Sequence, residues 1–150
     1  MIMVDFEVVI RAPASEVFEF VTNAENNSAW VGFAISARKL SCEPIGLGTR
    51  FSETGAVLGI RIPLVWEITE FEPDKRMKGE TVAGPAKFWG EYILETVTPG
   101  TRLRKLGGIQ LGGLLRLADP LLAGIFQQAL KEDMGRLRRL LELRQVNPIG

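Results

Sequence analysis

Residues 120–146, PLLAGIFQQALKEDMGRLRRLLELRQV, carry the strongest helix signal in the sequence. Apolar residues recur there at spacings of three and four, as on one face of a helix. They are Leu121, Leu122, Ile125, Phe126, Ala129, Leu130, Leu137, Leu140 and Leu141. Asp119 suits the N-cap and Pro120 the first helical position, while Asn147 and Pro148 end the pattern. The sequence therefore predicts one long amphipathic helix at the C-terminus.

The middle of the chain is typical of an antiparallel sheet. Turn-forming Gly and Pro residues divide it into short runs of alternating apolar and polar character. These runs predict strands near residues 35–43, 49–57, 61–71, 76–82, 87–98 and 101–110. Pro63 cannot donate a ladder hydrogen bond, so its part of the 61–71 strand should lie at an edge or a bulge.

The N-terminal region adds one strand and two short helices. Val4 to Ile10 alternate in the same way and predict a seventh strand. Pro13 suits the start of a helix that ends in the polar run 22–28, and we expect Trp30 on a second short helix. The chain is then a single α+β domain over residues 1–150, because no linker or repeat divides it. The long helix is the only element large enough to cover the sheet, and a pocket between the two is expected.

Composition excludes several classes of function. Eighteen Lys plus Arg balance eighteen Asp plus Glu, and a neutral chain is unlike a nucleic-acid binder. There is no His and one Cys, which argues against Ser–His or Cys–His catalysis, a disulfide and a metal site. We therefore expect no metal or cofactor. No stretch is typical of a targeting signal or a spanning helix, so a soluble cytoplasmic protein without stable membrane insertion is expected.

Five segments together resemble a known family. They are IRAPASEVFEFVTNAENNSAW (10–30), GLGTRFSETG (46–55), WEITEFEPDKRM (66–77), GPAKFWGEYILETVTPGTRL (84–103) and LADPLLAGIFQQALKEDMGRLRRLLE (117–142). Their order is similar to that of the START/Bet v 1-like (SRPBCC) superfamily, in particular its bacterial polyketide cyclase/dehydrase branch. The resemblance implies a helix-grip fold, in which a seven-stranded antiparallel sheet wraps around the C-terminal helix and encloses an elongated apolar cavity.

The resemblance also implies a range of functions. Similar proteins bind or carry lipids, sterols, hormones or quinones, or cyclise polyketides, and they share a cavity rather than one catalytic motif. The segment LGGIQLGG (106–113) departs from many relatives. It is a candidate for a flap at the cavity mouth, and it leaves the end of the seventh strand open.

Strand alternation selects the candidate ligand-binding residues. Charged side chains of one parity should face water, so side chains of the other parity should face the helix and the pocket. The candidates are Leu64, Trp66, Ile68, Phe88, Gly90, Tyr92 and Leu94 on the strands, with Phe126 and Leu130 on the helix. The alternative is that all of these residues belong to the hydrophobic core and contact no ligand. Tyr92 is the most informative of the set, because a buried hydroxyl needs a partner and could orient a ligand.

Three further features have a structural and a functional interpretation. Asp133 lies within about 20° of Phe126 on the helical wheel and could face the pocket, but pairing with Arg136 at the rim is favoured. A structural role at the helix–sheet junction is favoured for Trp30. Four arginines cluster near the C-terminus, namely Arg136, Arg138, Arg139 and Arg144. A solvent-exposed helix face accounts for this cluster, and transient contact with a membrane surface is the alternative.

Three functions remain open at this point. We favour a non-enzymatic binder or carrier of a small hydrophobic molecule, such as a lipid, sterol, quinone or polyketide-like compound. The second is a polyketide cyclase or dehydratase that uses Tyr92, Asp133 or an inward Glu or Arg as acid–base groups. The third is an interaction protein whose pocket receives another protein's hydrophobic segment. The absence of His and of a clear acid–base constellation favours the first; the ligand and the oligomeric state stay open.

Overall fold

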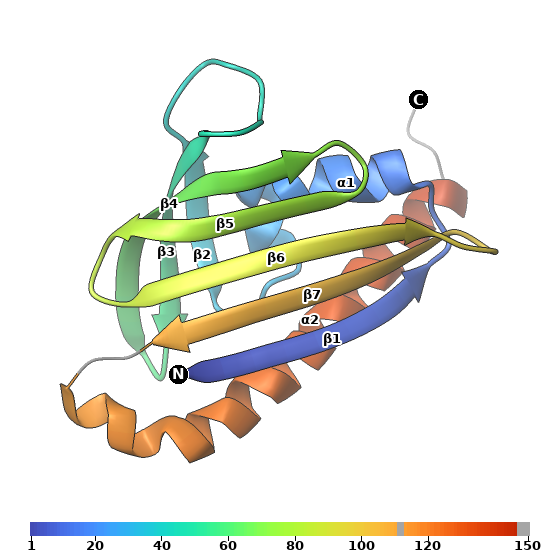
Figure 1. Ribbon diagram of the computed structural model, residues 1–150. Helices are drawn as coiled ribbons and strands as arrows, with labels where there is room; N and C mark the ends of the chain where they lie inside the picture. The colour runs from blue at the N-terminus through green and yellow to red at the C-terminus, as the bar shows by residue number, and fades with distance from the viewer. Residues whose placement is uncertain (111–112, 147–150) are drawn as a thin grey trace.

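The computed structural model describes residues 1–110 and 113–146. Seven strands form one antiparallel sheet in the order β1-β7-β6-β5-β4-β3-β2 (Figure 1). The elements are β1 (Ile2–Ile10), α1 (Ala14–Thr22), η1 (Ala24–Ala29), β2 (Ala34–Lys39), β3 (Arg50–Val57), β4 (Ile60–Glu72), β5 (Arg76–Ala83), β6 (Lys87–Thr96), β7 (Thr101–Gln110), η2 (Gly113–Ala118) and α2 (Asp119–Val146). The predicted α+β helix-grip fold is confirmed.

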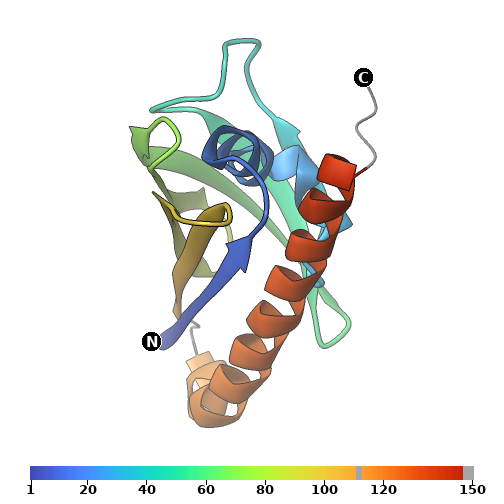
Figure 2. The same cartoon turned by 90° about the vertical axis from the view of Figure 1, so that its right-hand side faces the viewer.

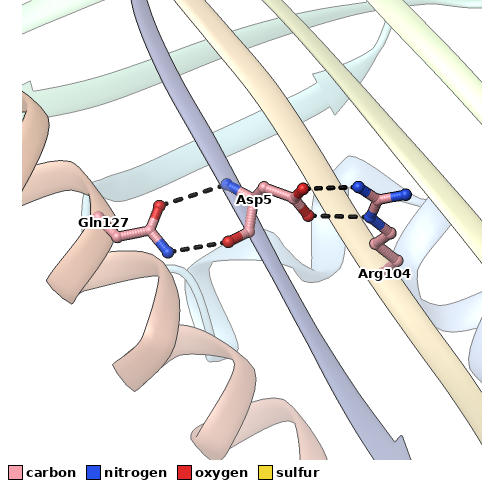
Figure 3. A network of polar contacts seen from close by, with 3 residues as sticks. All are labelled: Asp5, Arg104 and Gln127. Atoms are coloured by element: carbon pink, nitrogen blue, oxygen red, sulfur yellow. Dashed lines mark hydrogen bonds and ion pairs between the residues drawn. The ribbon is translucent and has the colours of Figure 1, made fainter.

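Helix α2 runs along the open side of the curled sheet (Figure 2) and bonds to the edge strand β1. The Gln127 side chain accepts the Asp5 backbone N–H at 3.2 Å and donates to the Asp5 carbonyl at 2.8 Å (Figure 3). On the neighbouring strand β7, Arg104 donates to both carboxylate oxygens of Asp5 at 2.9 and 2.6 Å. Gln127 thus satisfies edge groups that would otherwise be open to another strand.

The same helix is attached to the connection between η1 and β2. Phe126 packs edge-on against Phe33, with ring centroids 5.3 Å apart. About two turns further along α2, the Asp133 carboxylate accepts a hydrogen bond from the Gly32 N–H at 3.0 Å. Arg136 Nε donates to the Trp30 carbonyl at 3.1 Å. Because α2 bonds to both ends of the curl, it holds the curled sheet closed around its inner face.

Two hydrophobic clusters pack on this inner face. The larger one joins α1, η1, the inner face of the sheet and the C-terminal half of α2, and it includes Phe18, Phe51 and Leu137. The smaller one includes Ile109 and Phe126. The long helix places its buried residues Leu122, Phe126, Leu130, Met134, Leu137 and Leu141 across both clusters.

The strand bounds differ from the predicted ones mainly at two ends. The predicted strands 35–43 and 87–98 end at Lys39 and Thr96. Pro63 lies where β4 pairs with β3 alone, since pairing of β4 with β5 begins at Val65. Strand β4 thus has a free edge at Pro63, in agreement with the prediction.

Two local expectations were wrong. The polar run after α1 forms η1, because the Asn23 side chain accepts the Glu25 N–H and caps a new helical turn. Trp30 is the residue that ends η1, not part of a helix after it. The proposed flap at 106–113 is strand β7 as far as Gln110, paired on both sides. Of the remainder, residues 111–112 lie outside the described part of the chain and η2 begins at Gly113.

Candidate functional site

A cavity of about 280 Å³ lies between the inner face of the sheet, helix α2 and the segment that follows η1. Its wall is mostly apolar, and residues of both hydrophobic clusters contribute to it. Six of the nine predicted residues line it, namely Leu64, Trp66, Phe88, Gly90, Tyr92 and Phe126. The inward parity expected for β4 and β6 therefore brings these side chains together.

The other three predicted residues do not line the cavity. Ile68, Leu94 and Leu130 belong to the larger hydrophobic cluster, where α1 side chains such as Phe18 fill the space over the sheet. Ile68 is fully buried, and Leu94 and Leu130 are each 6% exposed. Alternation identifies the face of a strand on which a residue lies, but not how far along the strand the cavity extends.

Three glycines form a row on the floor of the cavity. Gly79, Gly90 and Gly107 are directly paired across β5, β6 and β7. A Cβ added at Gly79 would meet the Trp66 ring at 2.8 Å, and one at Gly107 would meet Val4 Cγ2 at 3.2 Å. A Cβ added at Gly90 would meet nothing closer than a backbone oxygen 3.9 Å away. Register is continuous at Gly90, so this glycine marks open space and not a bulge.

Trp66 forms one polar corner of the cavity. Its ring stacks on Phe51 with centroids 4.8 Å apart, and its indole N–H donates to Glu53 at 2.7 Å. Glu53 also accepts from the Asn27 side-chain amide at 3.3 Å. The Asn27 side-chain oxygen is buried and accepts no hydrogen bond from the described residues. This corner offers hydrogen-bond acceptors to a ligand.

Tyr92 and Lys105 form a second polar corner. The Lys105 ammonium donates to the Tyr92 hydroxyl at 2.7 Å and lies 5.6 Å from the centroid of the Trp30 ring. Both Tyr92 and Lys105 line the cavity, whereas Trp30 is buried behind it at the helix–sheet junction. The partner expected for the buried hydroxyl is thus a lysine that was absent from the predicted site residues.

Strand alternation contained a signal for Glu53 and Lys105, because each is a charged residue at an apolar, inward-facing position of its strand. Lys105 shares its parity with Leu103 and Ile109, and Glu53 shares its parity with Phe51 and Val57. A charged residue on the apolar parity of a strand is unusual, because a charge there must leave water. Asn27 lies on η1 and gave no such signal.

Asp133 is a buried residue of α2, bonded to the segment that follows η1, and it does not line the cavity between sheet and helix. It pairs with Arg136, as favoured; the Asp133 side chain is buried, whereas that of Arg136 is 40% exposed. Burial raises the pKa of Asp133 above its ordinary value, while the Gly32 N–H and the charges of Arg136 and Lys105 act in the opposite direction. A role in chemistry inside the cavity is therefore not supported by its position.

The arginines of α2 are largely engaged with neighbouring side chains. Arg138 pairs with Glu142 at 3.3 Å, and the Arg144 guanidinium lies 5.3 Å from the centroid of the Phe20 ring. Across residues 1–110 and 113–146, no group of three His, Cys, Asp or Glu side chains gathers as a metal site would require. No helix in those ranges is long and apolar enough to cross a membrane.

A family model described as "Polyketide cyclase / dehydrase and lipid transport" matches residues 1–142. The chain belongs to this family. The aromatase/cyclase Zhui from Streptomyces sp. R1128 has a similar structure, with a TM-score of 0.79 at 16% identity over 99% of this chain and 97% of that one. The aromatase/cyclase therefore shares the curled sheet and long helix described above.

Two other solved structures are similar to this family member. A protein from Thermus thermophilus gives a TM-score of 0.74 at 20% identity, over 99% of each chain. The di-domain ARO/CYC BexL from the BE-7585A biosynthetic pathway gives 0.73 at 18% identity, over 99% of this chain and 48% of that one. At these identities the similarity establishes the fold. A comparison with the curated proteins finds no match.

Proposed function

We propose that this chain binds a small hydrophobic molecule in the cavity between sheet and helix. One observation carries the proposal: the inner face is left open at Gly90, in the middle of an otherwise packed sheet. Interiors are normally packed densely, and apolar cavities with a few polar groups are the usual form of a small-molecule site. Membership of a family described by both polyketide cyclisation and lipid transport supports the same conclusion.

The proposed contacts are the six predicted residues that line the cavity. Leu64, Phe88 and Phe126 supply apolar walls, Gly90 supplies room, and Trp66 and Tyr92 supply an aromatic surface next to each polar corner. A lipid, sterol, quinone or aromatic polyketide has the required apolar body. We favour binding or carriage over catalysis because Asp133 lies outside the cavity and Glu53, which lines it, already accepts hydrogen bonds from Trp66 and Asn27.

Native mass spectrometry of the purified protein tests this proposal. A copurified small molecule would add a discrete mass, and extraction would identify it. In parallel, the emptied protein is titrated with fatty acids, sterols, quinones and aromatic polyketides while tryptophan emission is recorded, because Trp66 lines the cavity. If no compound is retained and none changes the emission, the binding function is wrong.

A polyketide cyclase or dehydratase is the second candidate. The observation that favours it is the Tyr92 hydroxyl held on the Lys105 ammonium in the cavity wall, because such a phenol can donate a proton to a carbonyl. Incubation with a linear poly-β-ketone and analysis by mass spectrometry would separate the two candidates. An enzyme would release a product that has lost water, and Tyr92→Phe would slow its formation; a carrier would return the compound unchanged.

A further inference from the structure

We propose that Lys105 and Tyr92 form an anion-binding end of the cavity, which takes the acidic oxygen of an otherwise apolar ligand. The inference rests on the proposed binding function and makes it more specific. It predicts an amphiphile that carries a carboxylate, sulfonate or ionised phenol, rather than a neutral hydrocarbon-like molecule. Its basis is the position, charge and hydrogen bonding of Lys105.

Lys105 lies on the inner face of β7, where its cross-strand neighbours are apolar or aromatic. It pairs with Phe6 of β1 on one side and with Tyr92 of β6 on the other, and Tyr92 in turn pairs with Met77 of β5. Lys105 is half-buried in this row, and a cation there loses part of its hydration without a carboxylate beside it in the sheet.

No carboxylate among the described residues neutralises the Lys105 charge by direct contact. The ion pairs within 4.0 Å in that part of the chain do not include Lys105. Asp133 is near enough for the Lys105 charge to lower its pKa, but its carboxylate bonds to Gly32 and Arg136. Glu53 is engaged by Trp66 and Asn27. The positive charge is therefore left for a molecule that enters the cavity.

Hydrogen-bond donors are also in excess at this end. The Lys105 ammonium carries several N–H donors, and the structure shows one bonded to the Tyr92 hydroxyl. That hydroxyl acts as an acceptor, so its own O–H is left to donate. An oxyanion can accept hydrogen bonds from both the ammonium and the phenol. Such bonds are stronger than hydrogen bonds between neutral groups, because one partner is charged.

The apolar part of the ligand has a defined place relative to this end. Along the inner face of β6, Tyr92 is followed towards the open floor by Gly90 and then by Phe88, which belongs with the smaller hydrophobic cluster. An acidic group at Lys105 would therefore set the ligand body over Gly90 and against Phe88 and Phe126. Charge and shape then fix one orientation of the ligand.

Two fluorescent dyes that share one ring system test the proposal. Anilinonaphthalene sulfonate carries an anionic group, and phenylnaphthylamine is the same skeleton without it. Their dissociation constants are measured for the wild type, Lys105→Met and Lys105→Arg. We expect the wild type to prefer the sulfonate, and Lys105→Met to weaken sulfonate binding by about tenfold or more, since a hydrogen bond to a charged group contributes at least that factor. The neutral dye should change by less than about twofold, the size of an ordinary surface effect.

Two control variants separate the charge at this position from the effects of substitution in general. Lys131→Met removes the same charge from an exposed position on α2 and should leave both dyes unaffected. Lys105→Arg keeps the charge and should keep the preference for the sulfonate. If Lys105→Met does not fold, Tyr92→Phe serves instead, because it removes the hydroxyl and keeps the ring; it should weaken sulfonate binding alone.

The outcomes separate this inference from the binding function on which it rests. If Lys105→Met weakens both dyes equally, or neither, the anion-binding end is wrong while cavity binding stands. If neither dye binds the wild type, or if Gly90→Leu leaves both affinities unchanged, the dyes do not occupy the cavity and the binding function itself is contradicted.

Discussion

Gly90→Leu is the perturbation that tests most directly whether the cavity serves a ligand. Gly90 lines the cavity, its register in β6 is continuous, and a Cβ there would meet nothing closer than 3.9 Å. Its backbone does not lie in the left-handed region that only glycine adopts readily. A leucine can therefore enter the space without backbone strain, and it would occupy volume that the ligand needs.

The expected change in stability is small. A glycine inside a strand destabilises by roughly 0.5–1 kcal/mol relative to alanine, so the substitution removes that penalty. The added side chain buries apolar surface in a partly open cavity, which adds a further gain and no packed neighbour to displace. We expect the free energy of unfolding to be unchanged or raised by about 1 kcal/mol, or about 2–4 °C in the thermal midpoint of a chain this long. Ligand affinity should fall by about tenfold or more, because hydrophobic contacts are lost and space is blocked.

Gly79→Leu is the matched control on the neighbouring strand. Gly79 pairs directly with Gly90, but its Cβ would meet the Trp66 ring at 2.8 Å. Overpacking there should lower the free energy of unfolding by about 1–3 kcal/mol. Thermal unfolding and dye titration are run on both variants. If Gly90→Leu is destabilised as much as Gly79→Leu and its folded fraction binds as well as the wild type, Gly90 serves the backbone and the reasoning is refuted.

Three further substitutions probe the wall of the cavity and the attachment of α2. Trp66→Ala should weaken the binding of an apolar dye by roughly 1–3 kcal/mol in the folded fraction; an unchanged dissociation constant would remove Trp66 from the site. Gln127→Leu loses both bonds to the edge strand and should lower the free energy of unfolding by about 1 kcal/mol, with faster amide exchange at Asp5 as the local readout. Burial raises the pKa of Asp133 in the folded state. The contribution of this carboxyl group to the free energy of unfolding is therefore fully present below its ordinary pKa of 3.8 and is lost as the pH rises through its folded-state pKa. Urea unfolding from acid to neutral pH should show the wild type losing stability relative to Asp133→Asn; parallel curves would contradict the assigned pKa shift.

The fold could be predicted because its local signals agree with one another. The period of the C-terminal helix and the turns between strands each indicate one arrangement, and the resemblance to a helix-grip family indicates the same one. The boundaries that failed were set by single polar side-chain contacts, which the apolar pattern does not reveal. The polar run after α1 became helical because Asn23 caps it, and β2 ended at Lys39, whose N–H donates to the side chain of Glu25.

The site was only partly predictable, because alternation is a rule about faces. It placed Trp66, Gly90 and Tyr92 on the inner face correctly. It could not distinguish them from Ile68 or Leu94, which share that face beneath α1 and are packed core. Position along a strand is set by which helices cover it, and that information is absent from the strand's own sequence.

Strand β7 shows where stability and function conflict in this molecule. Its inner positions run Thr101, Leu103, Lys105, Gly107 and Ile109, so two adjacent inner positions carry a cation and a bare backbone. Each is unfavourable in a sheet interior, the lysine through desolvation and the glycine through lost packing and chain entropy. Both positions line the cavity, beside the open space over Gly90. Departures from local sequence rules that are concentrated at one concave surface are typical of a site retained for a ligand rather than for stability, which supports an amphiphilic anion as the occupant.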